Sequence, residues 1–165
     1  MPTTVSVLAS VVHPQRALRV DVVTGTGFNL TFDTADAGEL RAGAGPTESL
    51  LAALAGCASM DVGPILRKKR QQAASYRISV TGERSDEHPR IYTGIVVEHQ
   101  VSGEVEPEAL RRAIELSATR YCPVNAMLAW GKVTIHHRYV ARSEAGETAG
   151  EVVVVGPDGA GLEGA

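Results

Sequence analysis

Two cysteines are the side chains of this sequence best suited to chemistry. The 165-residue chain contains only Cys57, in the apolar run "ALAGCASMD", and Cys122, in "RYCPVNAML". Thiolates are nucleophiles, and two of them can form a disulfide. In a reducing compartment such a pair is more often catalytic or redox-active than a structural cross-link. The alternative is that both are small core residues, because free cysteine is among the most buried residue types.

The local sequence favours Cys122 as the more acidic thiol. Cys122 precedes Pro123 at a predicted helix start, where free backbone N–H groups and the helix dipole stabilise an anion. Arg120 adds a positive charge nearby. Cys57 lies within an apolar helix, where burial raises a thiol pKa, and an ionised Asp61 four residues later would raise it further. Cys122 is therefore predicted to be the better local nucleophile, and Cys57 would need a cation from elsewhere.

The spacing of the candidate ligands does not predict a metal centre. There is no CxxC motif, and the two cysteines are 65 residues apart. His136 and His137 are adjacent on a predicted strand, so their rings point to opposite faces and would chelate a metal poorly. We therefore expect neither a metal ion nor an organic cofactor.

Composition and charge exclude several other classes of protein. The net charge is −3 and the longest basic run is "RKKR" at 67–70, which argues against a nucleic-acid partner. The first residues lack the basic start and apolar core of a signal peptide. No uninterrupted apolar run reaches the roughly 18 residues of a membrane span. We expect a cytoplasmic protein without a membrane or nucleic-acid partner.

The elements that must position the cysteines begin with strands rich in Val and Thr. Strands are predicted at 3–12, 17–25 and 27–32, with the first two forming a hairpin. A long helix is predicted to begin at Pro46 and to end near "RKKR". Its segment 49–58 is apolar nearly all round, which is typical of a helix buried in a core or in an interface.

The second half of the chain adds strands and helices in clusters. Strands are predicted at 75–84, 90–103 and 132–142, and helices at 106–121 and 123–130. This order favours an α+β fold, formed by a single domain over 1–141. The remaining tail, 142–165, is rich in Gly and Glu and contains a candidate short strand in "EVVVVG".

The two cysteine motifs together resemble a known family. "GPTESLLAALAGCASMDV", followed by "CPVNAML", is similar to the OsmC/Ohr family of osmotically inducible and organic hydroperoxide resistance proteins, and "GFNLTF" also resembles OsmC. The resemblance covers about residues 1–141. It implies an intertwined α+β homodimer in which antiparallel sheets pack on a long central helix carrying the first cysteine, with two sites at the subunit interface.

The resemblance also implies a reaction, that of a thiol-dependent peroxidase. Cys57 would attack an organic hydroperoxide and become a sulfenate, and Cys122 would resolve it as a disulfide, which reverses the local ranking of the thiols. An external dithiol, of the lipoyl type in the family, would then reduce the disulfide. Four apolar residues are candidate lining that favours organic peroxides: Leu54, Met60, Met127 and Trp130. The alternatives are a non-catalytic small-molecule-binding module on the same scaffold and a redox sensor.

In the family an arginine held by a glutamate stabilises the first thiolate, and this sequence departs from that pattern. The glutamate position is occupied by Thr47, with Glu48 one residue later, and the arginine position falls near Thr31. The basic residues available instead are Arg16, Arg19 and Arg41. We expect Arg41 and Glu48 to serve Cys57; alternatively, Arg41 is a solvated loop charge and Glu48 complements the helix dipole.

Helix geometry limits how Glu48 could act. Glu48 and Cys57 are nine residues apart, which corresponds to about 13.5 Å of rise and about half a turn in one helix. Two such side chains cannot meet. Glu48 must then act from a partner subunit, or it must precede the regular helix.

Overall fold

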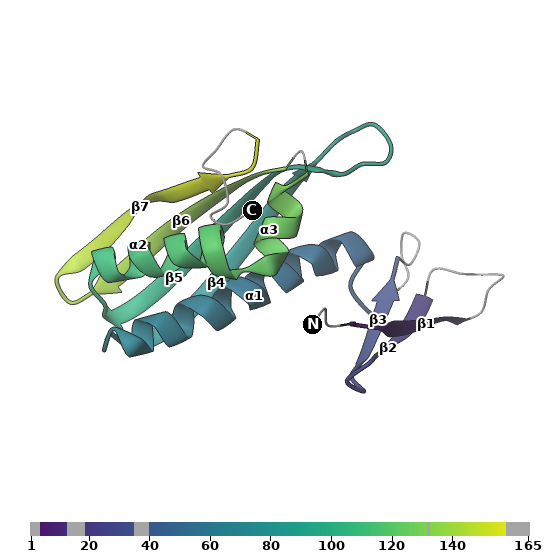
Figure 1. Ribbon diagram of the computed structural model, residues 1–165, viewed down its shortest axis with the longest axis horizontal. Helices are drawn as coiled ribbons and strands as arrows, with labels where there is room; N and C mark the ends of the chain where they lie inside the picture. Colours follow the sequence, from purple (N-terminus) through teal and green to yellow (C-terminus); the bar gives the residue numbers. More distant parts are fainter. Residues whose placement is uncertain (1–3, 13–18, 35–39, 132, 158–165) are drawn as a thin grey trace. The chain divides into compact units, whose positions relative to one another are not determined.

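The computed structural model describes residues 4–12, 19–34, 40–131 and 133–157. The chain divides into two compact units, residues 1–50 and 51–165, and each is described on its own. The division falls within the long helix α1 (Pro46–Lys68), which begins at the predicted proline. Figure 1 shows the elements of both units.

The first unit contains a three-stranded antiparallel sheet. Strands β1 (Val7–Val12), β2 (Arg19–Thr24) and β3 (Asn29–Asp33) lie in that order, so the predicted hairpin and third strand are confirmed. Several large apolar side chains of this unit are exposed in the single chain: Val7, Leu8, Phe28 and Leu30. The turn predicted at 13–16, with Arg16, lies outside the described residues.

The second unit is built on a four-stranded sheet. Its strands lie in the order β4 (Gln72–Arg84), β5 (Tyr92–Glu104), β6 (Thr134–Ser143) and β7 (Gly146–Val155). The β4–β5 and β6–β7 pairs are antiparallel, whereas β5 and β6 are parallel. The expectation of purely antiparallel sheets is wrong for this pair, because the helices between β5 and β6 return the chain to the same end of the sheet. The tail contributes β7, which includes the "EVVVV" segment.

The helices of the second unit lie on one face of this sheet (Figure 1). They are α1, α2 (Pro107–Leu116) and α3 (Pro123–Ala129), with a π-helical turn, η1 (Ser117–Tyr121), between α2 and α3. Helix α1 buries one stripe at four-residue spacing, consisting of Leu54, Ala58, Val62 and Leu66. This stripe packs with alternating residues of β5 and β6, among them Val97, Val101 and Ile135. The core therefore fixes the rotation of α1 and the direction in which its other side chains point.

Helix α1 is long and apolar over most of its length. Among the described residues it is the one helix whose length and composition would allow it to cross a membrane. Of its most apolar 18-residue stretch, 22% is buried in the chain. The finding does not contradict the predicted lack of an uninterrupted apolar run, because Asp61 and Pro64 interrupt the apolar residues of α1 although the mean hydropathy of this stretch reaches 1.6. A core helix of a soluble protein passes the same test, so the finding is weak evidence for a membrane span.

Candidate functional site

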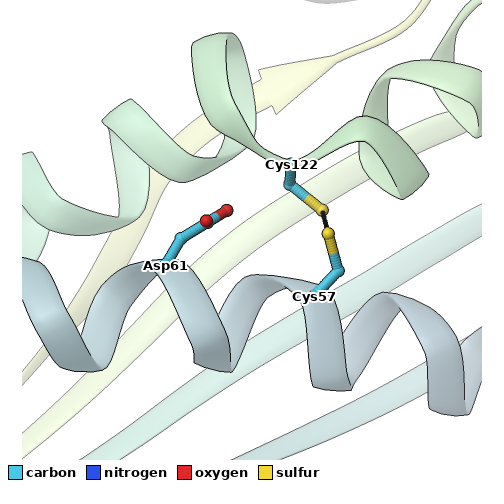
Figure 2. Close-up of side chains that lie close together, drawn as sticks. All are labelled: Cys57, Asp61 and Cys122. Carbon is cyan, nitrogen blue, oxygen red and sulfur yellow. Dashed lines mark hydrogen bonds between the residues drawn. The ribbon is translucent and has the colours of Figure 1, made fainter. Parts of the chain in front are cut away.

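The structure brings the two cysteines into contact. Cys57 lies in the middle of α1 and Cys122 lies between η1 and α3. Both are free thiols, and the Cys122 S–H donates to Cys57 Sγ across 2.7 Å (Figure 2). Packing of the helices on the sheet thus joins two residues that are 65 positions apart.

Cys122 owes its position to the chain on either side of it. The π-helical turn η1 ends at Tyr121, and the Cys122 N–H donates to the carbonyl of Ser117 at 2.9 Å. Pro123 then restricts Cys122 to an extended conformation and opens α3, as predicted. Cys122 caps this helix, because its Sγ accepts from the backbone N–H of Asn125 at 3.3 Å. Short π-helical turns are frequent at functional sites, but the sequence did not signal this one.

Burial overturns the acidity predicted for Cys122. Cys122 is only 3% exposed, whereas Cys57 is partly exposed. Burial, followed by the hydrogen bond to Cys57, raises the pKa of Cys122 to about 12. The prediction of an acidic Cys122 was therefore wrong, because loss of hydration outweighs the one backbone N–H of the short helix α3. The more accessible thiol is Cys57.

Asp61 is the third polar group at the cysteine pair. It lies one turn after Cys57 on α1, and one of its carboxylate oxygens and the two sulfur atoms all lie within 4.8 Å of one another (Figure 2). The Ser117 hydroxyl donates to Asp61 Oδ2 at 2.9 Å. The sequence predicted that Asp61 faces Cys57 but gave no indication that it also approaches Cys122.

Asn125, whose backbone N–H donates to Cys122, is also hydrogen-bonded to a buried imidazole, His137. Asn125 is fully buried, and its Nδ2 donates to the carbonyl of Ala118 at 2.6 Å. Its Oδ1 lies 2.9 Å from His137 Nε2 and can only accept, so His137 carries its proton on Nε2. Burial lowers the pKa of His137 to about 4, so this imidazole is neutral near pH 7. The alternation of strand β6 predicted that His136 and His137 face opposite sides, and His137 is indeed buried while His136 pairs with Glu151.

A second buried imidazole lies beside the first. The rings of His99 and His137 are 6.0 Å apart, and His99 Nδ1 lies 2.8 Å from the hydroxyl of Tyr76. Burial, with a smaller effect of His137, lowers the pKa of His99 to about 3. Burial also raises the pKa of Tyr76. Sequence reasoning placed no weight on His99, although it continues the inward alternation of Val97 and Val101.

Two predicted helper residues belong to the first unit. Arg41 is exposed. Glu48 lies in the first turn of α1, where Oε2 accepts from the backbone N–H of Gly45 at 3.3 Å. Because Glu48 and Cys57 both belong to α1, the helical separation noted from the sequence applies within one chain. The alternative cation Arg19 lies 3.5 Å from Asp21. Roles of Arg41 and Glu48 toward the cysteines remain predictions.

The predicted apolar lining divides into buried and exposed residues. Leu54 is buried in the same core cluster as Cys122, against which Cys57 also packs. Met60, Met127 and Trp130 are 78%, 65% and 68% exposed. In the single chain these three side chains therefore lie on the surface and do not line a closed cavity.

Comparisons with known proteins agree on the fold. A family model described as OsmC-like protein matches residues 37–138. Protein YhfA of Escherichia coli K12 is 40% identical over 95 residues, which cover 57% of this chain and 70% of YhfA. The crystal structure of an OsmC-like protein from Mycoplasma pneumoniae superposes with a TM-score of 0.73 at 18% identity, covering 86% of this chain and 99% of that one. An organic hydroperoxide resistance protein from Elizabethkingia anophelis superposes with a TM-score of 0.63 at 13% identity, with coverages of 87% and 97%.

Proposed function

The chain belongs to the OsmC-like protein family, and on that premise we propose that it is a thiol-dependent peroxidase that reduces organic hydroperoxides. The observation that carries the proposal is the 2.7 Å contact between the sulfur atoms of Cys57 and Cys122. Sulfurs this close can form a disulfide without a large movement of the backbone. Proteins named for organic hydroperoxide resistance share the fold.

The proposed reaction begins at Cys57, the more exposed thiol. Its thiolate attacks the peroxide, the O–O bond breaks, and the products are an alcohol and the Cys57 sulfenic acid. The Cys122 thiol then displaces water from the sulfenic acid and forms the Cys57–Cys122 disulfide. A dithiol, which we propose to be of the lipoyl type, returns both thiols by exchange and leaves as its own disulfide.

Arg41 completes this proposal as the cation that stabilises the Cys57 thiolate, and Glu48 as the carboxylate that holds the arginine. Because α1 separates Glu48 from Cys57 of the same chain, the clamp would use Glu48 of the partner subunit. Lipoyl-type dithiols and reduced thiols are compatible with a cytoplasmic location, which we include in the proposal.

A binding or redox-sensing module is the second candidate. The observation that favours it is the raised pKa of Cys122, which is caused first by burial and then by the hydrogen bond to Cys57. A thiol of this kind reacts slowly until a cation or a conformational change activates it.

Hydroperoxide consumption by the purified protein tests the first candidate against the second. With a lipoyl-type dithiol present, we expect tert-butyl hydroperoxide and cumene hydroperoxide to be consumed catalytically and faster than hydrogen peroxide. Loss of peroxide and oxidation of the dithiol should be measured together, with Cys57→Ser as the inactive control. Peroxide loss at the rate of the control would favour the binding or sensing module.

We also propose that the functional form is a homodimer. Segment 49–58 is apolar nearly all round, but within the single chain only Leu54 and Ala58 of this segment are buried. Leu50, Met60, Met127 and Trp130 are exposed, as are large apolar residues of the first unit. Exposed apolar side chains on each of the two units are typical of proteins in which a partner subunit covers them.

Light scattering should therefore report a mass of twice 17.4 kDa at micromolar concentration. We expect the dimer to bury well over about 2,000 Å² in total, as obligate dimers do. Met60→Glu, which places a charge on an exposed apolar position of α1, should weaken dimerisation, whereas Asp86→Asn in the β4–β5 loop should not. A folded wild-type monomer at micromolar concentration would contradict the proposal.

A further inference from the structure

Three metal-ligating side chains meet at the cysteine pair, and we propose that they bind a divalent ion of the zinc class. The two sulfur atoms and one Asp61 oxygen lie within 4.8 Å of one another (Figure 2). Zinc binds cysteine sulfur at about 2.3 Å and carboxylate oxygen at about 2.0–2.2 Å, so ligand atoms of one tetrahedral site lie about 3.5–4 Å apart. The three atoms are therefore grouped on the scale of one coordination sphere.

Only a small adjustment separates this arrangement from a bound state. The sulfur atoms, 2.7 Å apart as a hydrogen-bonded pair, would have to separate by about 1 Å to hold one ion. Rotation of the partly exposed Cys57 side chain about its χ1 angle moves its sulfur by that amount without shifting the helix. The spacing of Cys57 and Asp61, one helical turn apart, places both ligands on the same face of α1.

The donor set selects the kind of ion. Two thiolates and one carboxylate suit zinc and similar borderline-soft ions, whereas Mg²⁺ and Ca²⁺ require oxygen ligands. Three protein ligands leave a fourth tetrahedral position for water or another small ligand. The absence of a CxxC motif in the sequence does not argue against such a site, because the tertiary structure assembles the ligands.

The charges around the cysteines also favour a cation. Cys57 and Asp61, whose ligand atoms lie within 4.8 Å of the Cys122 sulfur, both become anionic when they ionise. A site with two thiols and a carboxylate gathers negative charge as it ionises, and a divalent ion offsets that charge directly. Metal binding would therefore draw two protons off the thiols and become tighter as the pH rises.

Neighbouring groups already orient two of the ligands. The Ser117 hydroxyl donates to Asp61 Oδ2, which holds the carboxylate toward the sulfurs while its second oxygen can still ligate. The backbone N–H of Asn125 donates to Cys122 Sγ, and Asn125 is itself anchored to Ala118. Hydrogen bonds of this kind to ligand atoms are a regular feature of protein metal sites.

This inference goes beyond the proposed peroxidase function and does not depend on it. An ion bound to both sulfurs occupies the lone pairs that a disulfide would use, so metal binding and disulfide formation exclude each other. A metal ion bound to both sulfurs would therefore hold the pair in its reduced dithiolate form. The experiment below contains no peroxide, so the metal site and the peroxidase can fail separately.

Anaerobic titration of the reduced 165-residue chain with Co²⁺ tests the site. We expect one equivalent to bind and to produce a near-ultraviolet thiolate-to-cobalt charge-transfer band with the intensity of two thiolates. One equivalent of Zn²⁺ should bleach this band. Cys57→Ser should reduce the band to the intensity of one thiolate or abolish it.

Variants of Asp61 test the third ligand. Asp61→Asn keeps the shape of the side chain but should weaken Co²⁺ binding at least about 10-fold. Asp61→Cys should restore binding and raise the band to the intensity of three thiolates, and it does not depend on whether Asp61→Asn folds. Asp86→Asn, a matched change in an exposed loop, should bind as the wild type does.

Two results would overturn the inference. The first is a wild-type protein that shows no charge-transfer band with Co²⁺ in excess. The second is a two-thiolate band whose affinity and intensity are the same in wild type, Asp61→Asn and Asp61→Cys, because the carboxylate would then not be a ligand.

Discussion

Replacing Cys122 with serine should turn a catalyst into a reagent that reacts once. The Cys122→Ser variant keeps the accessible Cys57 but lacks the thiol that lies 2.7 Å from it, so the sulfenic acid formed on Cys57 cannot be resolved within the chain. We expect steady-state peroxide turnover to fall roughly 10³-fold or more, the order seen when one member of a cooperating catalytic set is removed. One equivalent of organic hydroperoxide should leave a trappable sulfenic acid on Cys57, and excess should carry it to sulfinic acid.

The chain contains only two cysteines, which makes the products easy to assign. Mass spectrometry of peroxide-treated wild type should show loss of both free thiols and an intramolecular 57–122 bridge. Cys57→Ser is the reciprocal control, and its buried Cys122 should remain a free thiol. If Cys57 is unmodified in both wild type and Cys122→Ser, the peroxidase proposal fails and the binding or sensing module replaces it.

Acid should destabilise the fold through two buried imidazoles, His99 and His137. Burial lowers the pKa of His99 to about 3 and that of His137 to about 4, whereas both titrate near 6.5 in an unfolded chain. Below pH 6.5 the unfolded chain therefore binds more protons than the folded one, and the free energy of unfolding decreases as the pH falls. The stabilisation is fully present above pH 6.5 and is lost as the pH falls to about 4 for His137 and to about 3 for His99.

The expected size of this effect is large. At pH 4.5, each histidine lies two pH units below its unfolded pKa, which corresponds to roughly 2–3 kcal/mol per residue and roughly 5 kcal/mol for the pair. Since total stabilities of domains are typically about 5–15 kcal/mol, the protein should be close to unfolding at that pH. Urea denaturation at several pH values would measure the effect.

The slope of the unfolding free energy against pH distinguishes protonation of these histidines from a general loss of stability caused by substitution. In the double variant His99→Gln, His137→Asn, unfolding between pH 6.5 and 4.5 should take up about two protons fewer than in the wild type, which makes the slope shallower. This should hold even if the double variant is less stable at pH 7. His88→Gln, in an exposed loop, is the matched control and should keep the wild-type slope. Equal slopes in wild type and double variant would show that these imidazoles do not control acid stability.

The sequence by itself determined the elements and much of their orientation. Pro46 and Pro123 marked the starts of α1 and α3, because proline fits the first helical turn and excludes the residue before it from the helix. Alternation along β6 separated His136 from His137, and the resemblance in the two cysteine motifs identified the OsmC-like family. These are local signals, carried by neighbouring residues or by a short period, and they do not depend on what packs against them.

Only the tertiary structure decided the chemistry of the site. It brought Cys57 and Cys122 together across 65 residues and placed Asp61 beside both sulfurs. It also reversed the predicted acidity, because the pKa of Cys122 depends on the water that packing removes and not on the helix start alone. The parallel pairing of β5 with β6 was likewise set by the path of the intervening helices. Distance, hydration and charge at a site are sums over residues far apart in the chain, so they become defined only when the fold has brought those residues together.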